Sequence, residues 1–484
     1  MKKQFSRRRF LKFGTAAGGV ALAGFDLRAP SWVSQAHAQT PSLQGVPTLD
    51  GVLLFDEASR KTIAVDQSNF FHRIPAAVLR PGSVQDVVKI VQYANRRSLK
   101  VVMKGRGHSQ YAQTQVEGGI VIDSGNLNAV HLPTKDSVDA QPGAFWAIVA
   151  SQCLARGLTP PVFPATCLAL SVGGTLSVGG IGTTTIHHGA QVDTVTELDV
   201  VTGDGRLVTC SSDRESELFN MVLAGVGQCG IIVRARIRLI PAPIHVVLQN
   251  LIYSDVESYL ADQARAAADG RFDSQRGVLS KSNDGKWIFT MEVGKFYSSS
   301  AEPNLASLHS GLRFDSAATP VRMTYEEFLF RFEIGNAESA ARLAQQERRF
   351  LTMWMPATAT RDYLFYLFSK VVSFNRVSAY PLNTNRFTRP LFKVPDEKQA
   401  FAIWLFHASP EGNLEARSAI LASNRDLLAK MTALGGKRYA PYTGVMSPAD
   451  WQEHFGPEVW RRLSAAKKKY DPNNVLTPGP NMFV

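Results

Sequence analysis

The sequence has few cysteines, and none of them is spaced as metal ligands usually are. The chain of 484 residues carries only four: Cys153, Cys167, Cys210 and Cys229. No two of them form a C-x-x-C pair, which argues against a zinc site, and we expect no metal. In an oxidising compartment four cysteines could form up to two disulfides, and the spacing does not say which.

Long hydrophobic runs and long basic runs are missing as well. The apolar stretch at residues 13–25 is rich in Gly and Ala and too short to serve as a stop-transfer helix. Beyond residue 38 there is no long Lys/Arg run that would indicate a nucleic-acid-binding face. We therefore expect no nucleic-acid partner, and no stable membrane anchor once the N-terminal segment is removed.

The first 38 residues have the three parts of a twin-arginine signal peptide in order. Residues 6–12 read S-R-R-R-F-L-K, the mild apolar stretch follows, and Ala36-His37-Ala38 is an A-x-A cleavage site. Removing residues 1–38 takes away seven of the 53 basic and one of the 41 acidic residues, so the formal net charge falls from +12 to +6. The segment predicts a periplasmic or secreted protein, exported folded and often already loaded with its cofactor.

Residues 80–123 predict closely interleaved helices and strands. Apolar residues recur at helical spacing from Val84 to Ala94, after a Pro-Gly turn. Residues 101–103 and 120–122 read as buried strands.

The turn between these two strands, "MKGRGHSQYAQ" at residues 103–113, contains an unexplained histidine. Glycine-rich turns after strands commonly hold phosphates with backbone N–H groups, which needs no imidazole. His108 is therefore either a bystander in the loop or performs a second task on the same ligand.

Three further stretches complete the first half of the chain. Residues 171–187 are rich in glycine and uncharged, which predicts no ordinary helix but backbone lying tightly against a neighbour. Residues 197–210 predict a hairpin around Gly203-Asp204-Gly205. Residues 231–240 alternate between apolar side chains and arginines, as in a strand with one buried face.

Pro241-Ala242-Pro243 marks a predicted domain boundary, because the glycine content drops beyond it. We therefore divide the chain into a signal peptide at 1–38, a first domain at 39–243 and a second at 244–436. The turn-rich residues 470–483 belong to a closing segment, 437–484, that we expect to return to the first domain.

In combination, these segments resemble the vanillyl-alcohol-oxidase, or PCMH-type, FAD-binding fold, and within it the cytokinin dehydrogenases. The matching pieces are "RPGSVQDVVKIV", "KGRGHSQYAQ", "LSVGGTLSVGGIG", "ELDVVTGDGRLVTCS", "AGVGQCGIIVRARI" and "KKKYDPNNVLTPG". The resemblance implies an α+β fold: a two-subdomain PCMH-type FAD-binding domain plus an α+β cap, or substrate, domain with an antiparallel sheet.

The resemblance also implies FAD as the cofactor and gives His108 its task. Family members join the histidine of G-R-G-H-S to the 8α-methyl carbon of the flavin, which raises its reduction potential and prevents its loss after export. Carried over residue by residue, the cofactor-binding positions are Gly105, Arg106, Gly107, His108, Ser109, Gln113, Ser171, Gly174, Ser177, Ile181, Ile232, Tyr439 and Thr477. Ile181 and Ile232 can equally be read as ordinary core residues.

The sequence departs from the cytokinin dehydrogenases where those enzymes carry their acid/base aspartate. Thr166 stands at that position, and a threonine hydroxyl cannot act as a base near neutral pH. Cys167 stands at the next, where berberine-bridge-type relatives bond a cysteine to flavin C6; the alternative is a small buried cysteine that only packs. Pro480 replaces a glutamine of the family in the closing turn.

The leading functional prediction is an exported FAD-dependent oxidoreductase, with the catalytic base unassigned. A small-molecule substrate would lose hydride from a C–H next to an amine nitrogen or hydroxyl oxygen to flavin N5, and dioxygen or another acceptor would reoxidise the flavin. One alternative is a sugar or alcohol oxidase whose FAD is bonded through both His108 and Cys167. The other is a non-catalytic periplasmic flavoprotein. Arg386 or Arg389 could bind an anionic substrate or could form surface or inter-domain ion pairs.

Overall fold

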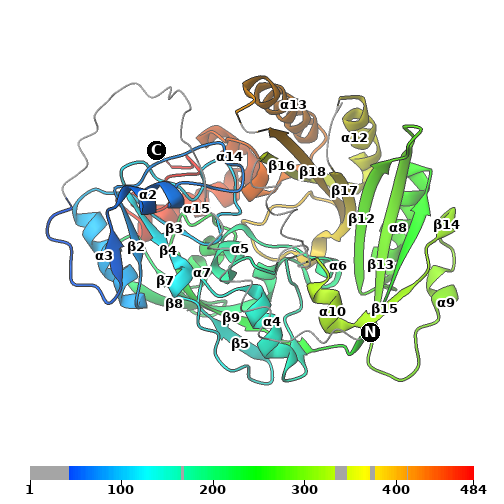
Figure 1. The fold of residues 1–484 in the computed structure, drawn as a ribbon, viewed down its shortest axis with the longest axis horizontal. Helices are drawn as coiled ribbons and strands as arrows, with labels where there is room; N and C mark the ends of the chain where they lie inside the picture. Colours follow the sequence, from blue (N-terminus) through cyan, green and yellow to red (C-terminus); the bar gives the residue numbers. More distant parts are fainter. Residues whose placement is uncertain (1–42, 165–167, 333–345, 371–375, 411, 484) are drawn as a thin grey trace. The chain divides into compact units, whose positions relative to one another are not determined.

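The computed structural model describes residues 43–164, 168–332, 346–370, 376–410 and 412–483. The elements form three larger β-sheets, one two-stranded sheet and surrounding helices (Figure 1). Thr166 and Cys167 lie outside the described residues. Residues Pro41–Val484 form one compact unit, and the domain boundaries drawn from the sequence stay predictions.

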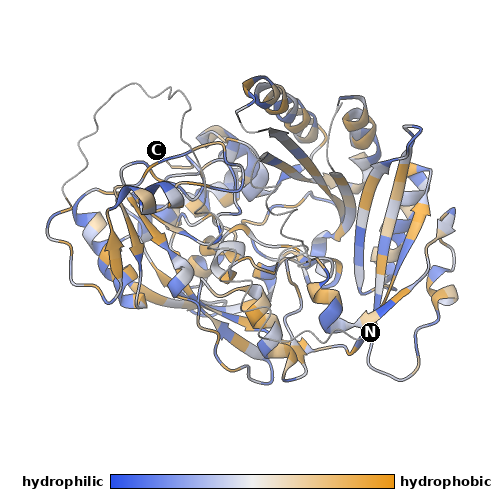
Figure 2. Cartoon of the chain, viewed as in Figure 1, coloured by the Kyte–Doolittle hydropathy of each residue, from blue (hydrophilic) through white to orange (hydrophobic). Residues whose placement is uncertain are grey.

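The first sheet has four strands in the order β1-β2-β4-β3 and carries the histidine turn at one strand end. Its strands are β1 (Val52–Leu54), β2 (Ala77–Arg80), β3 (Val101–Lys104) and β4 (Ile120–Asp123). The apolar strands β2, β3 and β4 stand out in Figure 2. They pack with α3 (Val84–Arg96), and α2 (Glu57–Ile63) lies nearby. The predicted helix and both predicted strands are confirmed.

The second sheet has four antiparallel strands in the order β5-β9-β7-β8. They are β5 (Ser137–Ala140), β7 (Val195–Val201), β8 (Leu207–Ser211) and β9 (Ile231–Arg238). The β7–β8 pair confirms the predicted hairpin. The alternation of β9 is confirmed too, since its aliphatic residues are buried while Arg234 pairs with Asp139 at 2.8 Å and Asp199 at 2.6 Å.

The prediction of no ordinary helix in residues 171–187 is wrong. This stretch forms α5 (Val172–Val178) and the single turn α6 (Thr185–His188). Glycine disfavours a helix by about 1 kcal/mol per residue, but here the tight packing of the helix requires glycine. A Cβ on Gly173 would lie 2.6 Å from the Cβ of Pro142, so the predicted close approach of this backbone to a neighbour is confirmed.

Other helices and short elements of this half join the first two sheets. They are η2 (Ser124–Asn126), α4 (Trp146–Leu154), η3 (Gln191–Thr194), α7 (Ser216–Val222) and the two-stranded sheet of β6 (Leu158–Thr159) and β10 (Ile240–Pro241).

The third sheet has nine antiparallel strands, in the order β14-β11-β13-β12-β17-β18-β16-β19 with β15 beside β11. The strands are β11 (His245–Tyr253), β12 (Ser274–Lys281), β13 (Trp287–Tyr297), β14 (Ser316–Ala317), β15 (Val321–Thr324), β16 (Gln346–Pro356), β17 (Arg376–Asn383), β18 (Gln399–Pro410) and β19 (Lys437–Arg438). The associated helices are α8 (Val256–Asp269), α9 (Leu305–His309), α10 (Tyr325–Phe330), α12 (Ala357–Lys370), η4 (Thr384–Arg386) and α13 (Leu414–Ala433).

One face of this sheet packs against α8, α12 and α13 in a single apolar core (Figure 1). In β18, Ile403 and Leu405 belong to that core, whereas the alternate residues Trp404 and Phe406 line the pocket described below. Because side chains alternate along a strand, the sheet separates a helix-covered core from a pocket wall.

The closing segment, 437–484, contains η5 (Ala440–Tyr442), α14 (Pro448–Phe455) and α15 (Pro457–Tyr470). After α15 the chain lies beside the first sheet. Leu476 forms a parallel bridge with Val101 of β3, and Thr477 N donates to the Val101 carbonyl at 2.8 Å. The buried Lys467–Asp471 pair, at 2.6 Å, ties the end of α15 to the residues that follow it.

Three of the four cysteines can be placed, and they form no disulfide with one another. Cys153, Cys210 and Cys229 are buried free thiols, and burial raises the pKa of each to about 12. A thiol reacts as its thiolate, so these three are unreactive packing residues at neutral pH. None of the helices in the described part of the chain combines the length and apolar character needed to cross a membrane.

Candidate functional site

A large pocket lies between the histidine turn, the glycine-rich helix α5, the closing segment and the third sheet. It encloses about 1320 Å³ free of protein atoms, counted with the solvent at its mouth. All the cofactor-binding residues predicted from the sequence line it, except Cys167, which is not described. They are Gly105, Arg106, Gly107, His108, Ser109, Gln113, Ser171, Gly174, Ser177, Ile181, Ile232, Tyr439 and Thr477.

The histidine turn is held in its conformation by residues 63–68. Gly107 has a φ of 65°, which favours glycine, and its carbonyl accepts from Gln67 N at 2.8 Å. Lys104 Nζ donates to the carbonyl of Ile63 at 2.6 Å and to that of Val65. Burial lowers the pKa of Lys104 to about 8. These bonds leave the turn little freedom before any ligand arrives.

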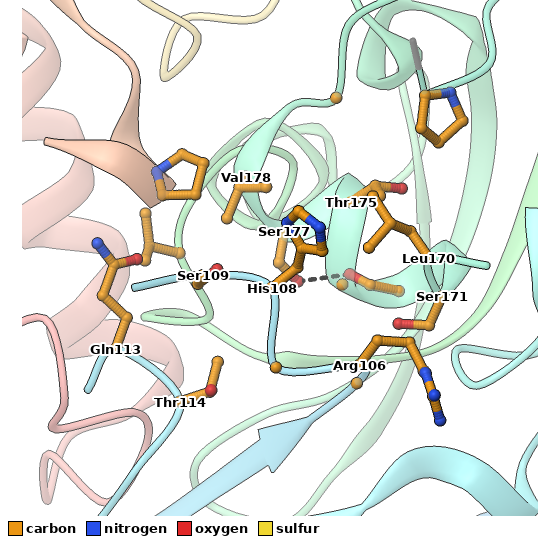
Figure 3. A pocket seen from close by; sticks show the side chains of 18 of the residues that line it. Arg106, His108, Ser109, Gln113, Thr114, Leu170, Ser171, Thr175, Ser177 and Val178 are labelled. Atoms are coloured by element: carbon orange, nitrogen blue, oxygen red, sulfur yellow. Dashed lines mark hydrogen bonds between the residues drawn. The ribbon is translucent and has the colours of Figure 1, made fainter. Parts of the chain in front are cut away.

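The His108 ring is fixed by a hydrogen-bond partner at each nitrogen. Nε2 lies 2.9 Å from Gln67 Nε2, and Nδ1 lies 2.7 Å from the Tyr442 hydroxyl. Which ring nitrogen carries the proton depends on the tautomer and on the orientation of the Gln67 amide, and both contacts can form with either tautomer. Figure 3 shows the His108 ring projecting into the pocket near Ser177 and Val178, while the Arg106 side chain points away from the ring. His108 is therefore presented to the pocket and is no bystander in a loop.

The glycine-rich side of the pocket touches the histidine turn directly. A Cβ on Gly105 would lie only 2.1 Å from Ser171 Oγ, so the two segments meet where glycine leaves the backbone bare. Ser177 Oγ donates back to the Gly173 carbonyl at 2.8 Å. Ile181 and Ile232 are almost fully buried and also line the pocket, so the two readings of these residues are compatible.

The closing segment forms another side of the pocket. Gln113 Nε2 donates to the Ala440 carbonyl at 2.7 Å, which ties the histidine turn to η5. The Tyr439 hydroxyl accepts from Gly180 N at 3.2 Å, and burial raises the pKa of Tyr439 above its usual value. Thr477 Oγ1 donates to the Gly227 carbonyl at 3.0 Å. Tyr439 is therefore neutral at physiological pH and serves as a wall.

The sequence prediction missed an aromatic wall. It consists of Phe350 from β16, Trp404 and Phe406 from β18, and Tyr442 from η5. Phe350 and Phe406 meet edge to face at 4.0 Å between ring centroids. Gln67, the partner of His108, was missed as well. The available signal was the i, i+2 spacing of Trp404 and Phe406 in a strand whose other face carries the apolar residues Phe401, Ile403 and Leu405.

The lining of the pocket fits a dinucleotide with a flat ring system. Three of its polar side-chain atoms are buried without a partner among the described residues: Gln113 Oε1, Thr114 Oγ1 and Gln191 Oε1. Bare glycine backbone and the aromatic wall line the same pocket. Buried polar atoms without partners are costly, so they favour a polar ligand at this place.

The other sequence candidates lie elsewhere. Arg389 is tied to the first half of the chain, since it donates to the carbonyl of Val192 at 3.2 Å and to Asn220 Oδ1 at 3.1 Å. Arg386 is exposed. Neither lines the pocket. The Pro480 carbonyl accepts from Trp451 Nε1 at 3.0 Å and serves the packing of the closing segment.

Comparison of the sequence with known families accounts for both halves of the chain. The family described as "FAD binding domain" matches residues 75–211, and that described as "Cytokinin dehydrogenase 1, FAD and cytokinin binding" matches residues 265–483. An uncharacterized oxidoreductase, ORF5 of the fasciation locus of Rhodococcoides fascians, is 31% identical over 90% of this chain and 99% of that protein. Cytokinin dehydrogenase 4 of Oryza sativa subsp. japonica is 31% identical over 91% of each chain.

The fold has a solved counterpart. The crystal structure of 6-hydroxy-D-nicotine oxidase from Arthrobacter nicotinovorans covers 89% of this chain and 98% of its own, with a TM-score of 0.69 and 20% sequence identity. At that identity the match confirms the α+β fold with a PCMH-type FAD-binding domain and antiparallel sheets. The chain therefore belongs to the FAD-linked oxidoreductases of the vanillyl-alcohol-oxidase type, in the group that contains the cytokinin dehydrogenases.

Proposed function

We propose that this chain is an exported oxidoreductase that removes a hydride from a carbon next to an amine nitrogen or a hydroxyl oxygen of a small molecule. His108 would hold the FAD by a covalent bond to the 8α-carbon. When bound, FAD would supply the two-electron acceptor for that hydride. The observation that carries the proposal is the His108 ring, fixed at both nitrogens and presented to a pocket that suits FAD.

The chain's own residues would bind the cofactor and orient the substrate. The bare backbone at Gly105 and Gly107 can bring N–H groups to a diphosphate, and Ser109 can add a hydroxyl donor. The aromatic wall can press a flat substrate against the flavin and exclude water from the reacting carbon. Each ring nitrogen of His108 has one hydrogen-bond partner. The nitrogen that bonds to the flavin carbon must give up its hydrogen bond.

The pocket offers few groups that could accept a proton from the substrate. None of the described residues that line it is Asp or Glu, and Tyr439 is held neutral by burial. An amine donor would therefore react as its free base, or would lose its proton to a group outside the described residues. This is consistent with the threonine at the family's aspartate position.

Anaerobic mixing with candidate donors tests the activity. We expect an amine such as isopentenyladenine, or an aromatic alcohol, to bleach the visible flavin absorbance of the purified protein, and simple sugars to leave it unchanged, because the wall of the pocket is aromatic. Bleaching by sugars instead would favour the bicovalent sugar oxidase. If dithionite bleaches the flavin and no donor does, the protein is a non-catalytic flavoprotein.

Export is tested by a conservative change in the signal peptide. In the double variant Arg7→Lys/Arg8→Lys, the charge is kept but the paired guanidinium groups are lost. We expect the unprocessed chain to remain inside the cell, as seen by fractionation and immunoblotting, whereas Lys2→Arg should be exported and processed normally. Export of the double variant at the wild-type level would refute the twin-arginine route.

A further inference from the structure

A second, smaller cavity adjoins the cofactor pocket. It contains about 340 Å³ free of protein atoms, again counted with the solvent at its mouth. Its lining residues are Phe163, Pro164, Leu168, Thr183, Thr184, Tyr325, Phe328, Leu329 and Arg331. Pro164 lines both cavities. In the segment after α5, Gly180 and Ile181 face the first cavity, and Thr183 and Thr184 face the second. A molecule bound at the aromatic wall could therefore extend one end toward this space.

Arg331, at the C-terminal end of α10, brings a positive charge to this cavity. Its Nη1 donates to the Phe328 carbonyl at 2.6 Å, and its Nη2 lies 3.1 Å from Glu292 Oε1. Its Nε is buried and has no acceptor among the described residues. Burial lowers the pKa of Arg331 to about 10, so the group stays charged at neutral pH.

Arg276 in β12 is a second positive charge close to Arg331; it is only 8% exposed and lies behind the residues that line the cavity. Its Nε is 3.9 Å from the same Glu292 Oε1, which is too long for a hydrogen bond. Neither Nε nor Nη1 of Arg276 has an acceptor in the described part of the chain. The Phe332 ring lies beside both guanidinium groups, 4.7 Å from Arg276 Cζ and 4.2 Å from Arg331 Cζ.

Among the described residues, these contacts leave the pair with an excess of positive charge. Within that part of the chain, two guanidinium groups share the single carboxylate of Glu292, and three buried N–H groups lack acceptors. A buried charge without a counter-charge is unfavourable, and so is a buried donor without an acceptor. Both features are relieved by one ligand group that is negative and accepts several hydrogen bonds.

We propose that Arg276 and Arg331 bind a carboxylate of the substrate, so that the enzyme favours amines or alcohols that carry an acidic group over neutral ones. A planar carboxylate matches the fork of a guanidinium and can accept from both arginines. The rings of Phe163 and Phe328 can hold the hydrocarbon part beside it. This inference rests on the proposed function and names the substrate class of the same site.

Calorimetric titration of the holoenzyme with benzoate and with benzamide tests the proposal. The two probes have nearly the same shape, and only benzoate is charged. We expect benzoate to bind at least about tenfold more tightly, as a charge-assisted hydrogen-bond pair should provide. In Arg276→Gln and Arg331→Gln that preference should fall to about threefold or less, and Arg331→Lys should restore part of it.

Two further variants separate charge recognition from general damage. Glu292→Gln removes the competing charge and keeps an acceptor, so benzoate should bind more tightly than in the wild type. Arg386→Gln removes an exposed arginine that lines neither cavity, and it should leave both affinities unchanged. Equal binding of the two probes by the wild type, no binding of benzoate, or a preference that survives in Arg276→Gln/Arg331→Gln would each overturn the proposal.

The titration is independent of turnover, so it can fail separately from the proposed function. Flavin bleached by neutral donors with no benzoate preference would retain the oxidoreductase and reject the carboxylate site. A benzoate preference in a protein whose flavin no donor bleaches would retain the anion site and reject the proposed activity.

Discussion

Replacing His108 with alanine is expected to abolish the proposed covalent attachment of the flavin. Alanine has no nitrogen to bond the 8α-carbon, and the contacts with Gln67 and Tyr442 are lost with the ring. The remaining pocket can still hold FAD through backbone and polar contacts, so the variant should purify with partial, releasable flavin. Its reduction potential should fall, and a fall of about 30 mV makes two-electron reduction about tenfold less favourable.

Acid denaturation followed by gel electrophoresis measures the first effect. The wild-type band should fluoresce, and the His108→Ala band should fall to background, with free flavin in the supernatant. His131→Ala is a suitable control, because His131 is exposed and does not line the pocket. Flavin that stays on the His108→Ala chain after acid would move the bond to another residue, with Cys167 the first to test.

Replacing Gly479 with alanine is expected to disturb the pocket, because this residue of the closing segment packs against the histidine turn. A Cβ at this position would lie 2.3 Å from the carbonyl oxygen of Gln113 and 2.4 Å from that of Ala112, in the histidine turn. Both contacts are with backbone, so the closing segment or the turn must move. We expect a loss of about 1–3 kcal/mol in unfolding free energy and a much lower flavin content.

Thermal unfolding of the flavin-depleted and flavin-loaded protein would show both effects. Gly125→Ala is the matched control, since the nearest atom to its Cβ is the flexible Asp123 Oδ1 at 3.2 Å. A Gly479→Ala protein with wild-type stability and full flavin content would show that the closing segment can shift without affecting the turn.

The sequence predicted the elements in which local pattern and final environment agree. Helix α3 has one apolar face that meets the first sheet, and the β7–β8 hairpin has Gly205 at a φ of 78° in its turn. The prediction for residues 171–187 failed because local propensity disfavours a glycine-rich helix. Glycine is nevertheless required in this helix, because only a residue without a side chain fits against Pro142 at position 173. The contact joins segments that are far apart in the sequence, so a local pattern cannot predict it.

The difference between local sequence patterns and contacts made only in the fold also explains which parts of the site could be predicted. The glycine turn and the closing segment carry dense local motifs, and their residues meet in one pocket. The aromatic wall and the arginine pair have no such motif. Arg276 and Arg331 come from β12 and the end of α10, and only the antiparallel pairing of β12 with β13 brings Arg276 beside Glu292. The sequence prediction named only Arg386 and Arg389 as possible ligands of an anionic substrate, and neither lines the pocket.

The bridge between Leu476 and Val101 makes the pocket depend on two segments that lie far apart in the sequence. Thr477 and the Gly479 turn contact β3 and the histidine turn, and both segments line the pocket or support its lining. The pocket is therefore complete only when both segments are in place, and a partly folded chain with the closing segment detached lacks one of its walls.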